Sequence, residues 1–182
     1  MLPEGYALRP LSMVDASALA AAYRRNRRHL RPWEPAREDS FFFEEGQAAV
    51  IVGQLSTIRR GTLACWLLHH GDAVVGRVNL NNIVLGVLCS SSLGYWVDAD
   101  HLGRGVARGA VEEVCLAAAD LGLHRVEAVT QLQNHASQRV LEACGFEPVG
   151  TARRLLFIDG AWRDHLVYQR LLHDRPLPAP RS

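Results

Sequence analysis

The sequence contains no lysine: all 20 of its basic residues are arginine, and with 19 acidic residues they give a formal net charge of +1. This near-neutral balance argues against a dedicated nucleic-acid-binding protein, which usually presents a strongly basic domain. The absence of lysine also excludes a Walker-type phosphate loop, which needs a Gly-Lys pair. We therefore expect no nucleic-acid partner, and any bound phosphate must be held by main-chain amides and arginine.

Long apolar runs and clustered cysteines are also missing. No stretch approaches the roughly 20 apolar residues that span a bilayer, and the start, MLPEGYALRP, lacks the pattern of a secretion signal. The four cysteines contain no Cys-x-x-Cys pair, so we expect neither a metal site nor a disulfide framework. These absences predict a cytoplasmic protein that does not associate with membranes. The expected buried thiols are Cys65, Cys89, Cys115 and Cys144.

Hydrophobic periodicity predicts a single α/β domain. The 182 residues, 48% of them hydrophobic, can bury roughly 70% of their unfolded surface in one core. Turn signals at 71–72 and 159–160 predict two hairpins. We expect the domain to cover 1–172 and a flexible, Pro-rich tail to cover 173–182. The pattern predicts strands at 6–9, 65–70, 73–82, 93–97, 125–129, 149–157 and 162–171, and helices that begin near 16, 48, 105 and 136.

The first predicted helix ends in an arginine run. Its simplest interpretation is a solvated face, with positive charge favourably placed at a helix C-terminus. The run consists of Arg24, Arg25, Arg27, Arg28 and Arg31.

A turn with two glycines joins the strand that ends at Val97 to the long helix that follows. The first N–H groups of a helix lack intrahelical acceptors, and the peptide dipoles leave that end partly positive. Gly103 and Gly105 allow an anion to approach the main chain closely, so the segment predicts a phosphate or pyrophosphate site. The turn could also be only a tight connection. A dinucleotide fold would place a third glycine where Arg108 stands, which excludes that interpretation.

Residues 102–107, LGRGVA, resemble the Q/R-x-x-G-x-G/A signature of the Gcn5-related N-acetyltransferase (GNAT) superfamily. Residues 134–146, NHASQRVLEACGF, resemble the N-x-A-S…V-L-E-x-x-G-F segment of RimJ/RimL-type protein N-terminal acetyltransferases. Residues 26–35, NRRHLRPWEP, resemble the N-x-x-x-L-x-P-W region of that subfamily, and GYWV at 94–97 fits its central strand. The resemblance spans residues 6–171. It implies a mixed, twisted central sheet of about seven strands flanked by about four helices.

The resemblance also implies that acetyl-CoA is the co-substrate and that no metal takes part. Asn134 is a good helix N-cap in any case, and the family adds a contact with the pantetheine arm. Ser137 is a candidate to protonate the departing thiolate, or only a serine in the first turn of a helix. The implied acetyl-CoA contacts are Val97, Gly103, Arg104, Gly105, Val106, Ala107, Arg108, Asn134 and Ser137.

Three residues are candidates for the acceptor side. Glu34 could bind the incoming amine or accept its proton through water, or be only an exposed loop carboxylate. Trp33 could line the acceptor site or anchor its own loop. Tyr95 could line the gap between the central strands or belong to the core. His101 is a possible base or only a solvated turn residue.

Two positions depart from the family pattern. Leu102 stands where glutamine or arginine is usual, which removes a side-chain contribution but leaves the main-chain amides. Leu156 stands where some relatives have a glutamate, so no strong base near the thioester is evident. An α-amine has a pKa of about 8, against about 10.4 for a lysine side chain, and needs less help to lose its proton.

The sequence therefore predicts an acetyl-CoA-dependent N-acetyltransferase in which a primary amine attacks the thioester directly. The expected acceptor is the N-terminal amine of a protein or peptide, and a ribosomal protein is one candidate. One alternative is a small amine or antibiotic as acceptor, and another is an inactive CoA-binding module. A monomer and a homodimer both fit the sequence.

Overall fold

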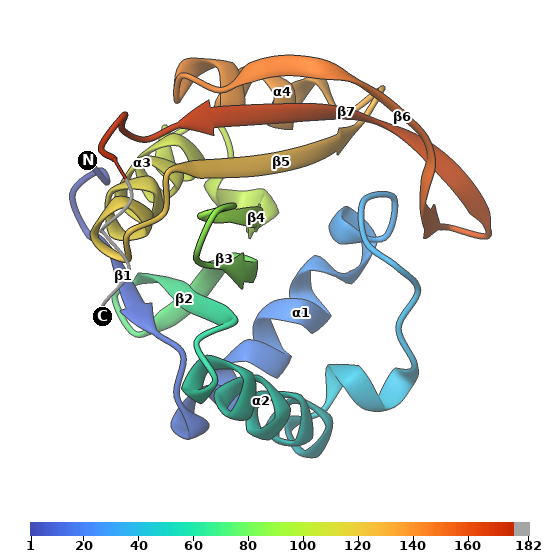
Figure 1. Cartoon of the computed structure of the whole chain (residues 1–182). Helices are drawn as coiled ribbons and strands as arrows, with labels where there is room; N and C mark the ends of the chain where they lie inside the picture. The colour runs from blue at the N-terminus through green and yellow to red at the C-terminus, as the bar shows by residue number, and fades with distance from the viewer. Residues whose placement is uncertain (177–182) are drawn as a thin grey trace.

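Residues 1–176 are described by the computed structural model, and they form a curved seven-stranded sheet with four α-helices (Figure 1). The predicted mixed sheet and its helices are thereby confirmed. Residues 177–182 of the predicted tail lie outside the described residues. The strands are β1 (Tyr6–Pro10), β2 (Leu63–His70), β3 (Ala73–Val84), β4 (Ser90–Val97), β5 (Arg125–Gln131), β6 (Glu147–Ile158) and β7 (Ala161–Leu171). The helices are α1 (Ala16–Leu30), α2 (Glu44–Arg59), α3 (Val106–Asp120) and α4 (His135–Ala143).

The strand order is β1-β2-β3-β4-β5-β7-β6, and the pairing of β4 with β5 is its parallel step. A parallel step requires a crossover, which α3 supplies. The β4–β5 ladder runs from Ser90↔Arg125 to Leu93↔Ala128 and ends there. Beyond Leu93, β4 continues to Val97 without β5 beside it. The sheet is thus split at its centre.

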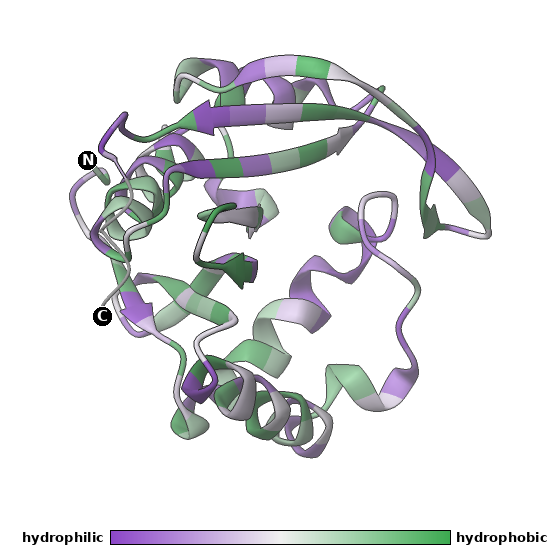
Figure 2. Ribbon diagram, in the orientation of Figure 1, coloured by the Kyte–Doolittle hydropathy of each residue, from purple (hydrophilic) through white to green (hydrophobic). Residues whose placement is uncertain are grey.

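Helices cover both faces of the sheet. Val78 and Leu80 of β3 pack with Val111 of α3 in one hydrophobic cluster, which also takes in α4. On the other face, Trp96 of β4 packs with Leu19 of α1 in a second cluster, which includes α2. In Figure 2, β3 and β4 carry hydrophobic segments between these layers, whereas the second half of α1 is hydrophilic. Side chains alternate along a strand, so β3 presents its polar residues to the α1 face.

Helix α2 begins earlier than predicted. Its first turn holds Glu44 and Glu45, which an apolar pattern cannot detect but which favour a helix N-terminus. The other helices lie close to their predicted positions, and all four cysteines are buried, as predicted. Within residues 1–176, none of the helices combines the length and apolar character needed to cross a bilayer.

The interpretation of the arginine run as a solvated face was wrong for part of it. Arg25 donates from Nε to Oδ2 of the buried Asp98 at 2.6 Å and from Nη2 to the Val74 carbonyl at 2.9 Å. Asn26, also buried, accepts the Ala99 N–H on Oδ1 at 2.9 Å. The middle of α1 is therefore fixed to the corner where β4 ends. Helical spacing could not reveal partners that lie 73 residues away.

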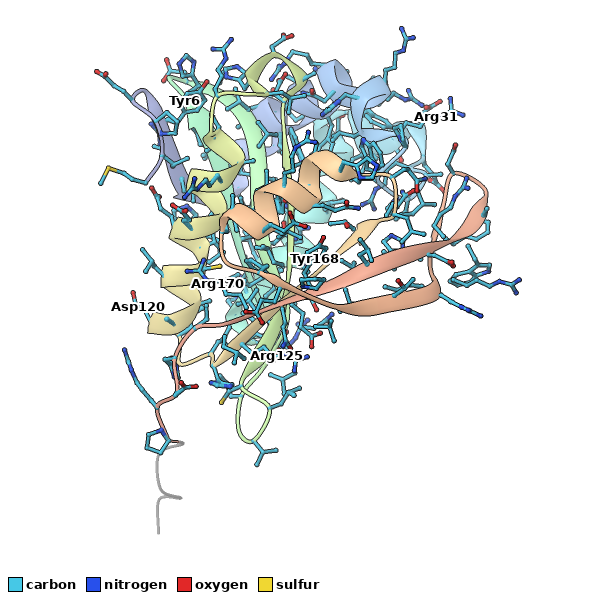
Figure 3. All side chains as sticks on the ribbon, turned by 90° about the horizontal axis from the view of Figure 1, so that it is seen from above. Tyr6, Arg31, Asp120, Arg125, Tyr168 and Arg170 are labelled. Carbon is cyan, nitrogen blue, oxygen red and sulfur yellow. The ribbon has the colours of Figure 1, made fainter. Side chains whose placement is uncertain are left out.

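The β6–β7 hairpin extends past the other strands on the side of the molecule where Arg31 lies (Figure 3). Arg31 Nε is 3.5 Å from Asp159 Oδ1 in the turn of this hairpin. Leu156, the position where some relatives have a glutamate, lies on β6 and is 40% exposed. The hairpin thus approaches the end of α1 and helps to enclose the space between α1 and the sheet.

Candidate active site

The glycine-containing turn forms a row of free main-chain amides at the start of α3. A short 3-10 helix, Ala99–His101, follows β4, and Gly103 and Gly105 then both adopt φ +74°. The N–H of Gly109 donates to the Gly105 carbonyl at 3.0 Å, so the N–H groups of 106–108 precede the intrahelical hydrogen bonds. A Cβ at Gly103 or Gly105 would meet no atom within 4 Å. We call residues 103–108 the amide cradle; its form fits a pyrophosphate.

The two arginines of the amide cradle differ in their availability. Arg108 donates from Nε to Glu112 Oε1 at 3.0 Å, so its guanidinium is held along α3. Arg104 is exposed and forms no ion pair with any residue among 1–176. Leu102 is 53% exposed and contributes no polar side chain. The main-chain amides and Arg104 are therefore the groups best placed for a phosphate.

We expect Gly105→Val to weaken CoA binding by about 10- to 100-fold. A β-branched residue in the left-handed region strains the backbone by on the order of 1–2 kcal/mol, and turning a peptide to relieve the strain removes amides that would hold a charged ligand. Calorimetric titration with CoA measures the effect. Gly71→Val is the matched control, because Gly71 also has a positive φ of 60° and open space at its Cβ but lies in the β2–β3 turn. Equal CoA affinity in the two variants would show that residues 103–108 are not the phosphate site.

Next to the amide cradle, the split between β4 and β5 leaves main-chain N–H groups unpaired. The Asp98 N–H donates to the Val75 carbonyl at 2.8 Å, toward β3. Successive residues of a strand direct their N–H groups to opposite edges, so the Val97 N–H points into the split. A donor at that position can polarise a thioester carbonyl that enters from the amide cradle.

Tyr95 and Ser137 meet across the split. The Tyr95 hydroxyl lies 2.8 Å from Ser137 Oγ, and it donates to the Ser137 carbonyl at 3.2 Å. Asn134 caps α4, since its Oδ1 accepts the Ser137 N–H at 3.1 Å. Burial raises the pKa of Tyr95, although the hydrogen bond with Ser137 opposes the shift. Tyr95 therefore remains protonated and can keep a hydrogen bond on Ser137.

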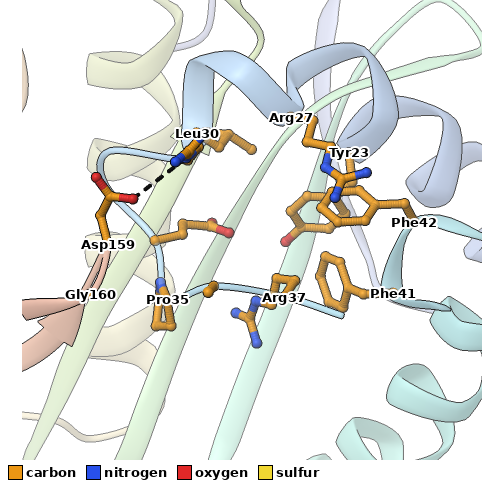
Figure 4. Close-up of a pocket in the computed structure, with 12 residues that line it drawn as sticks. Tyr23, Arg27, Leu30, Pro35, Arg37, Phe41, Phe42, Asp159 and Gly160 are labelled. Atoms are coloured by element: carbon orange, nitrogen blue, oxygen red, sulfur yellow. Dashed lines mark ion pairs between the residues drawn. The ribbon is translucent and has the colours of Figure 1, made fainter. Parts of the chain in front are cut away.

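Two connected cavities lie on the α1 face of the split. One, of about 300 Å³, is bounded by Tyr23, Phe41 and Phe42 on one side and by the Asp159–Gly160 turn on the other (Figure 4). The second, of about 250 Å³, lies over β3 and β4. Both are lined by Tyr23, Glu34 and Arg37, so we treat them as one acceptor cleft. Its lining over the sheet comprises Gln54, Arg77, Asn79, Asn81, Gly94, Tyr95 and Trp96.

Glu34 lies where the two cavities meet. Its N–H donates to the Leu30 carbonyl at 3.1 Å, which fixes it at the end of α1. Burial raises the pKa of Glu34, while the nearby guanidinium groups of Arg37 and Arg77 oppose the shift. Glu34 is thus a half-buried carboxylate that faces the cleft, rather than an exposed loop residue. A raised pKa brings a carboxylate closer to the range in which it can act as a base.

The loop that carries Glu34 is also held from β5. Gln131 donates from Nε2 to the Pro32 carbonyl at 2.6 Å. Trp33 is half-buried in this loop but lines neither cavity, whereas Glu34 lines both. His101 lies away from the cleft, with its Nδ1 2.7 Å from the Tyr6 hydroxyl. The predicted residues that come together around the split are therefore Glu34, Tyr95, Val97 and Ser137.

Several cleft residues were not predicted from the sequence. Tyr23, whose hydroxyl accepts the Trp96 indole N–H at 3.1 Å, belonged to the apolar stripe of a helix. Arg77, Asn79 and Asn81 alternate with Val78 and Leu80 inside an otherwise apolar strand. That two-residue period of polar side chains was the available signal, because it indicates a strand with one polar face.

Comparison with known proteins agrees with this geometry. Residues 6–147 match the family model described as the acetyltransferase (GNAT) domain. The chain is 32% identical over 157 residues to the [ribosomal protein uS5]-alanine N-acetyltransferase of Escherichia coli, covering 84% of this chain and 80% of that protein. Residues 6–147, which the family model matches, contain the whole amide cradle, the split and α4.

Solved structures extend the likeness to the whole described fold. The crystal structure of ribosomal-protein-S5-alanine acetyltransferase from Vibrio fischeri has a TM-score of 0.91 at 30% identity, over 97% of this chain and 98% of that one. Mycobacterium smegmatis RimJ in complex with CoA-disulfide has a TM-score of 0.86 at 31% identity, over 91% and 81%. The resemblance to RimJ/RimL-type enzymes is confirmed. The chain belongs to the acetyltransferase (GNAT) domain family, and it is an N-acetyltransferase that uses acetyl-CoA as its acetyl donor.

Proposed function

We propose that this protein acetylates the N-terminal α-amine of a protein, and that its acceptor is a ribosomal protein. The single observation that carries the proposal is the split sheet, with the amide cradle on one side and the acceptor cleft on the other. Relatives about 30% identical along most of the chain are named as acetyltransferases of an alanine of a ribosomal protein, which supports the acceptor class. Ribosomal acceptors would also make the protein cytoplasmic.

The proposed reaction assigns one task to each group around the split. Glu34, directly or through water, takes a proton from the ammonium of the acceptor. The free amine attacks the thioester carbon, and the Val97 N–H stabilises the charge that develops on the carbonyl oxygen. The carbon–sulfur bond then breaks as the Ser137 hydroxyl, held by Tyr95, donates a proton to the departing sulfur. The nitrogen of the new amide loses its second proton, which passes through water and restores the Ser137 hydroxyl. Alignment of two substrates in one site can supply roughly 7–11 kcal/mol of the barrier.

The charge of the cleft supports a peptide acceptor over a polyamine or a cationic drug. Four arginines and two carboxylates line the two cavities, so the cleft is not acidic. A polycation would meet like charges there, whereas a peptide end brings a single ammonium group to Glu34. The lining residues are Arg27, Arg31, Arg37, Arg77, Glu34 and Asp159.

An acceptor screen tests the proposal. Purified protein and acetyl-CoA are incubated with peptides that copy the N-termini of ribosomal proteins and with a panel of small amines, and mass spectrometry locates the acetyl group. We expect acetylation of peptide α-amines, with peptides that begin with alanine or serine among the best. Turnover of small amines alone would favour the small-molecule alternative. Binding of acetyl-CoA without turnover of any amine would favour the inactive module.

A further inference from the structure

Arg77 is the most deeply buried charge in the acceptor cleft, and it has no anionic partner among residues 1–176. It lies on β3 and is paired with Trp96 of β4, the residue before Val97. Arg77 is 8% exposed. Among residues 1–176, no carboxylate forms an ion pair with it. Arginine stays protonated in proteins, and a buried charge is normally paired. The guanidinium therefore lacks the group that would ordinarily accompany it.

Hydrogen bonds fix the orientation of this guanidinium. Arg77 donates from Nε to Asn79 Oδ1 at 2.8 Å. Asn79 then donates from Nδ2 to Asn81 Oδ1 at 3.2 Å, and Asn81 donates to the Ser92 carbonyl at 3.4 Å. This series of hydrogen bonds engages Nε of Arg77 and does not engage the two terminal nitrogens of the guanidinium. That terminal edge is a planar fork that matches a carboxylate with two parallel hydrogen bonds.

The neighbouring groups do not neutralise Arg77. The Cys65 thiol lies within hydrogen-bonding reach, but burial raises its pKa and keeps it uncharged. Burial likewise raises the pKa of Tyr23, which stays a neutral phenol. Glu34 lines the same cavity without forming an ion pair with Arg77, and Arg37 adds a second positive charge. Apart from the neutral thiol, the terminal nitrogens have no acceptor among residues 1–176, and Arg77 lines the cavity over the sheet.

We propose that Arg77 determines acceptor specificity by binding a carboxylate one or two residues from the reacting amine. This inference rests on the proposed function and refines it: the preferred acceptors are peptides with aspartate or glutamate at the second or third position. The position of Arg77 favours this role in acceptor specificity, because Arg77 lies beside the split, where the amine must reach the thioester. A free acidic amino acid carries the same chemistry in its own carboxylates, so the two sources must be compared.

The test measures a ratio of specificities. Matched peptides that begin Ala-Glu or Ala-Gln, and a second pair with the exchange at position three, are compared by kcat/KM, together with free glutamate and glutamine. We expect the wild type to prefer glutamate in at least one peptide pair by about 10- to 100-fold, the range for a charge-assisted hydrogen bond. Arg77→Met should abolish the preference, and Arg77→Lys should retain only part of it because the fork is lost. Arg59→Met, at the exposed end of α2, is the control and should keep the wild-type ratio.

A ratio is insensitive to a general loss of folded protein, and CoA binding verifies that each variant is folded. Equal rates for glutamate and glutamine peptides in the wild type, or an unchanged preference in Arg77→Met, would overturn the inference while the proposed function stands. Preference confined to the free amino acids would support the carboxylate site and contradict the protein acceptor. If no peptide or amino acid is acetylated, the proposed function and this inference both fail.

Discussion

Glu34→Gln is expected to lower kcat by about 10²- to 10⁴-fold, the usual contribution of a general base. The side chain keeps its size and polar contacts but can no longer accept the proton of the acceptor ammonium. Burial raises the pKa of Glu34, with Arg37 and Arg77 opposing. The wild-type rate should therefore fall as the pH drops through this raised pKa, because the carboxylate becomes protonated. In the variant this acid limb should disappear from the pH profile of kcat.

Steady-state kinetics over a pH series, with a saturating N-terminal peptide, measure both effects. Glu38→Gln is the matched control, since Glu38 lies in the same loop, is exposed and lines neither cavity. The control should retain the wild-type rate and profile. If Glu34→Gln also retains them, water or a main-chain carbonyl removes the proton without Glu34.

The second large effect concerns stability. Asp98 is 1% exposed and holds Arg25 at 2.6 Å, so Asp98→Ala leaves a guanidinium and the Asp100 N–H without their acceptor. The loss of one partner from a fully buried pair costs about 3–5 kcal/mol, but the Arg25 side chain is 42% exposed. We therefore expect a smaller loss, of about 2–3 kcal/mol of unfolding free energy. For a chain of this size, we expect Tm to fall on the order of 10 °C. The exposed neighbour Asp100 provides the control, and Asp100→Ala should shift Tm little.

The same pair makes a pH-dependent contribution to folding. Burial alone would raise the pKa of Asp98, but hydrogen bonds from Asn26, Asp100 and Arg25 and the charge of Arg25 lower it overall. A carboxyl whose pKa is lower in the folded state adds stability above its unfolded pKa of about 3.9 and loses it as the pH falls further. Denaturant titrations should therefore show a wild-type advantage over Asp98→Ala at pH 7 that shrinks toward pH 3. If the difference in unfolding free energy between the wild type and Asp98→Ala were the same at pH 7 and pH 3, folding would not lower the pKa of Asp98.

Local patterns were sufficient to predict the fold and the turn geometry of the amide cradle, which stays a proposed phosphate site. Two-residue and 3.6-residue periods located most of the seven strands and four helices, since most elements bury one face. Strand β6 is exposed along nearly its whole length, and the turn signal at 159–160 helped to locate it. The amide cradle could be predicted because its chemistry lies in a short segment around Gly103 and Gly105. A row of main-chain amides depends on a strand, a turn and a helix start that are contiguous in the chain.

The acceptor side could be predicted only in part, because it is assembled from distant segments. Glu34 was proposed from a motif, but the cavity that it faces is also lined by Arg77 of β3, which lies far away in the sequence. The partnership of Arg25 with Asp98 joins residues 73 positions apart, and no local pattern specifies such a pair. Trp33 could line the acceptor site or anchor its own loop, and the sequence could not decide between the two; in the structure it lines neither cavity.

Helix α1 gives the two substrate sites a shared support. Its middle is fixed to the corner that leads into the amide cradle, through Asp98 and Ala99, and the Leu30 carbonyl at its end accepts the Glu34 N–H. A displacement of this helix would therefore change both sites at once. Thermodynamic linkage then requires reciprocity: any factor by which bound acetyl-CoA changes the affinity for the acceptor is the factor by which the acceptor changes the affinity for acetyl-CoA. The strength of the coupling between the two substrates would thus depend on how rigidly this one helix is held.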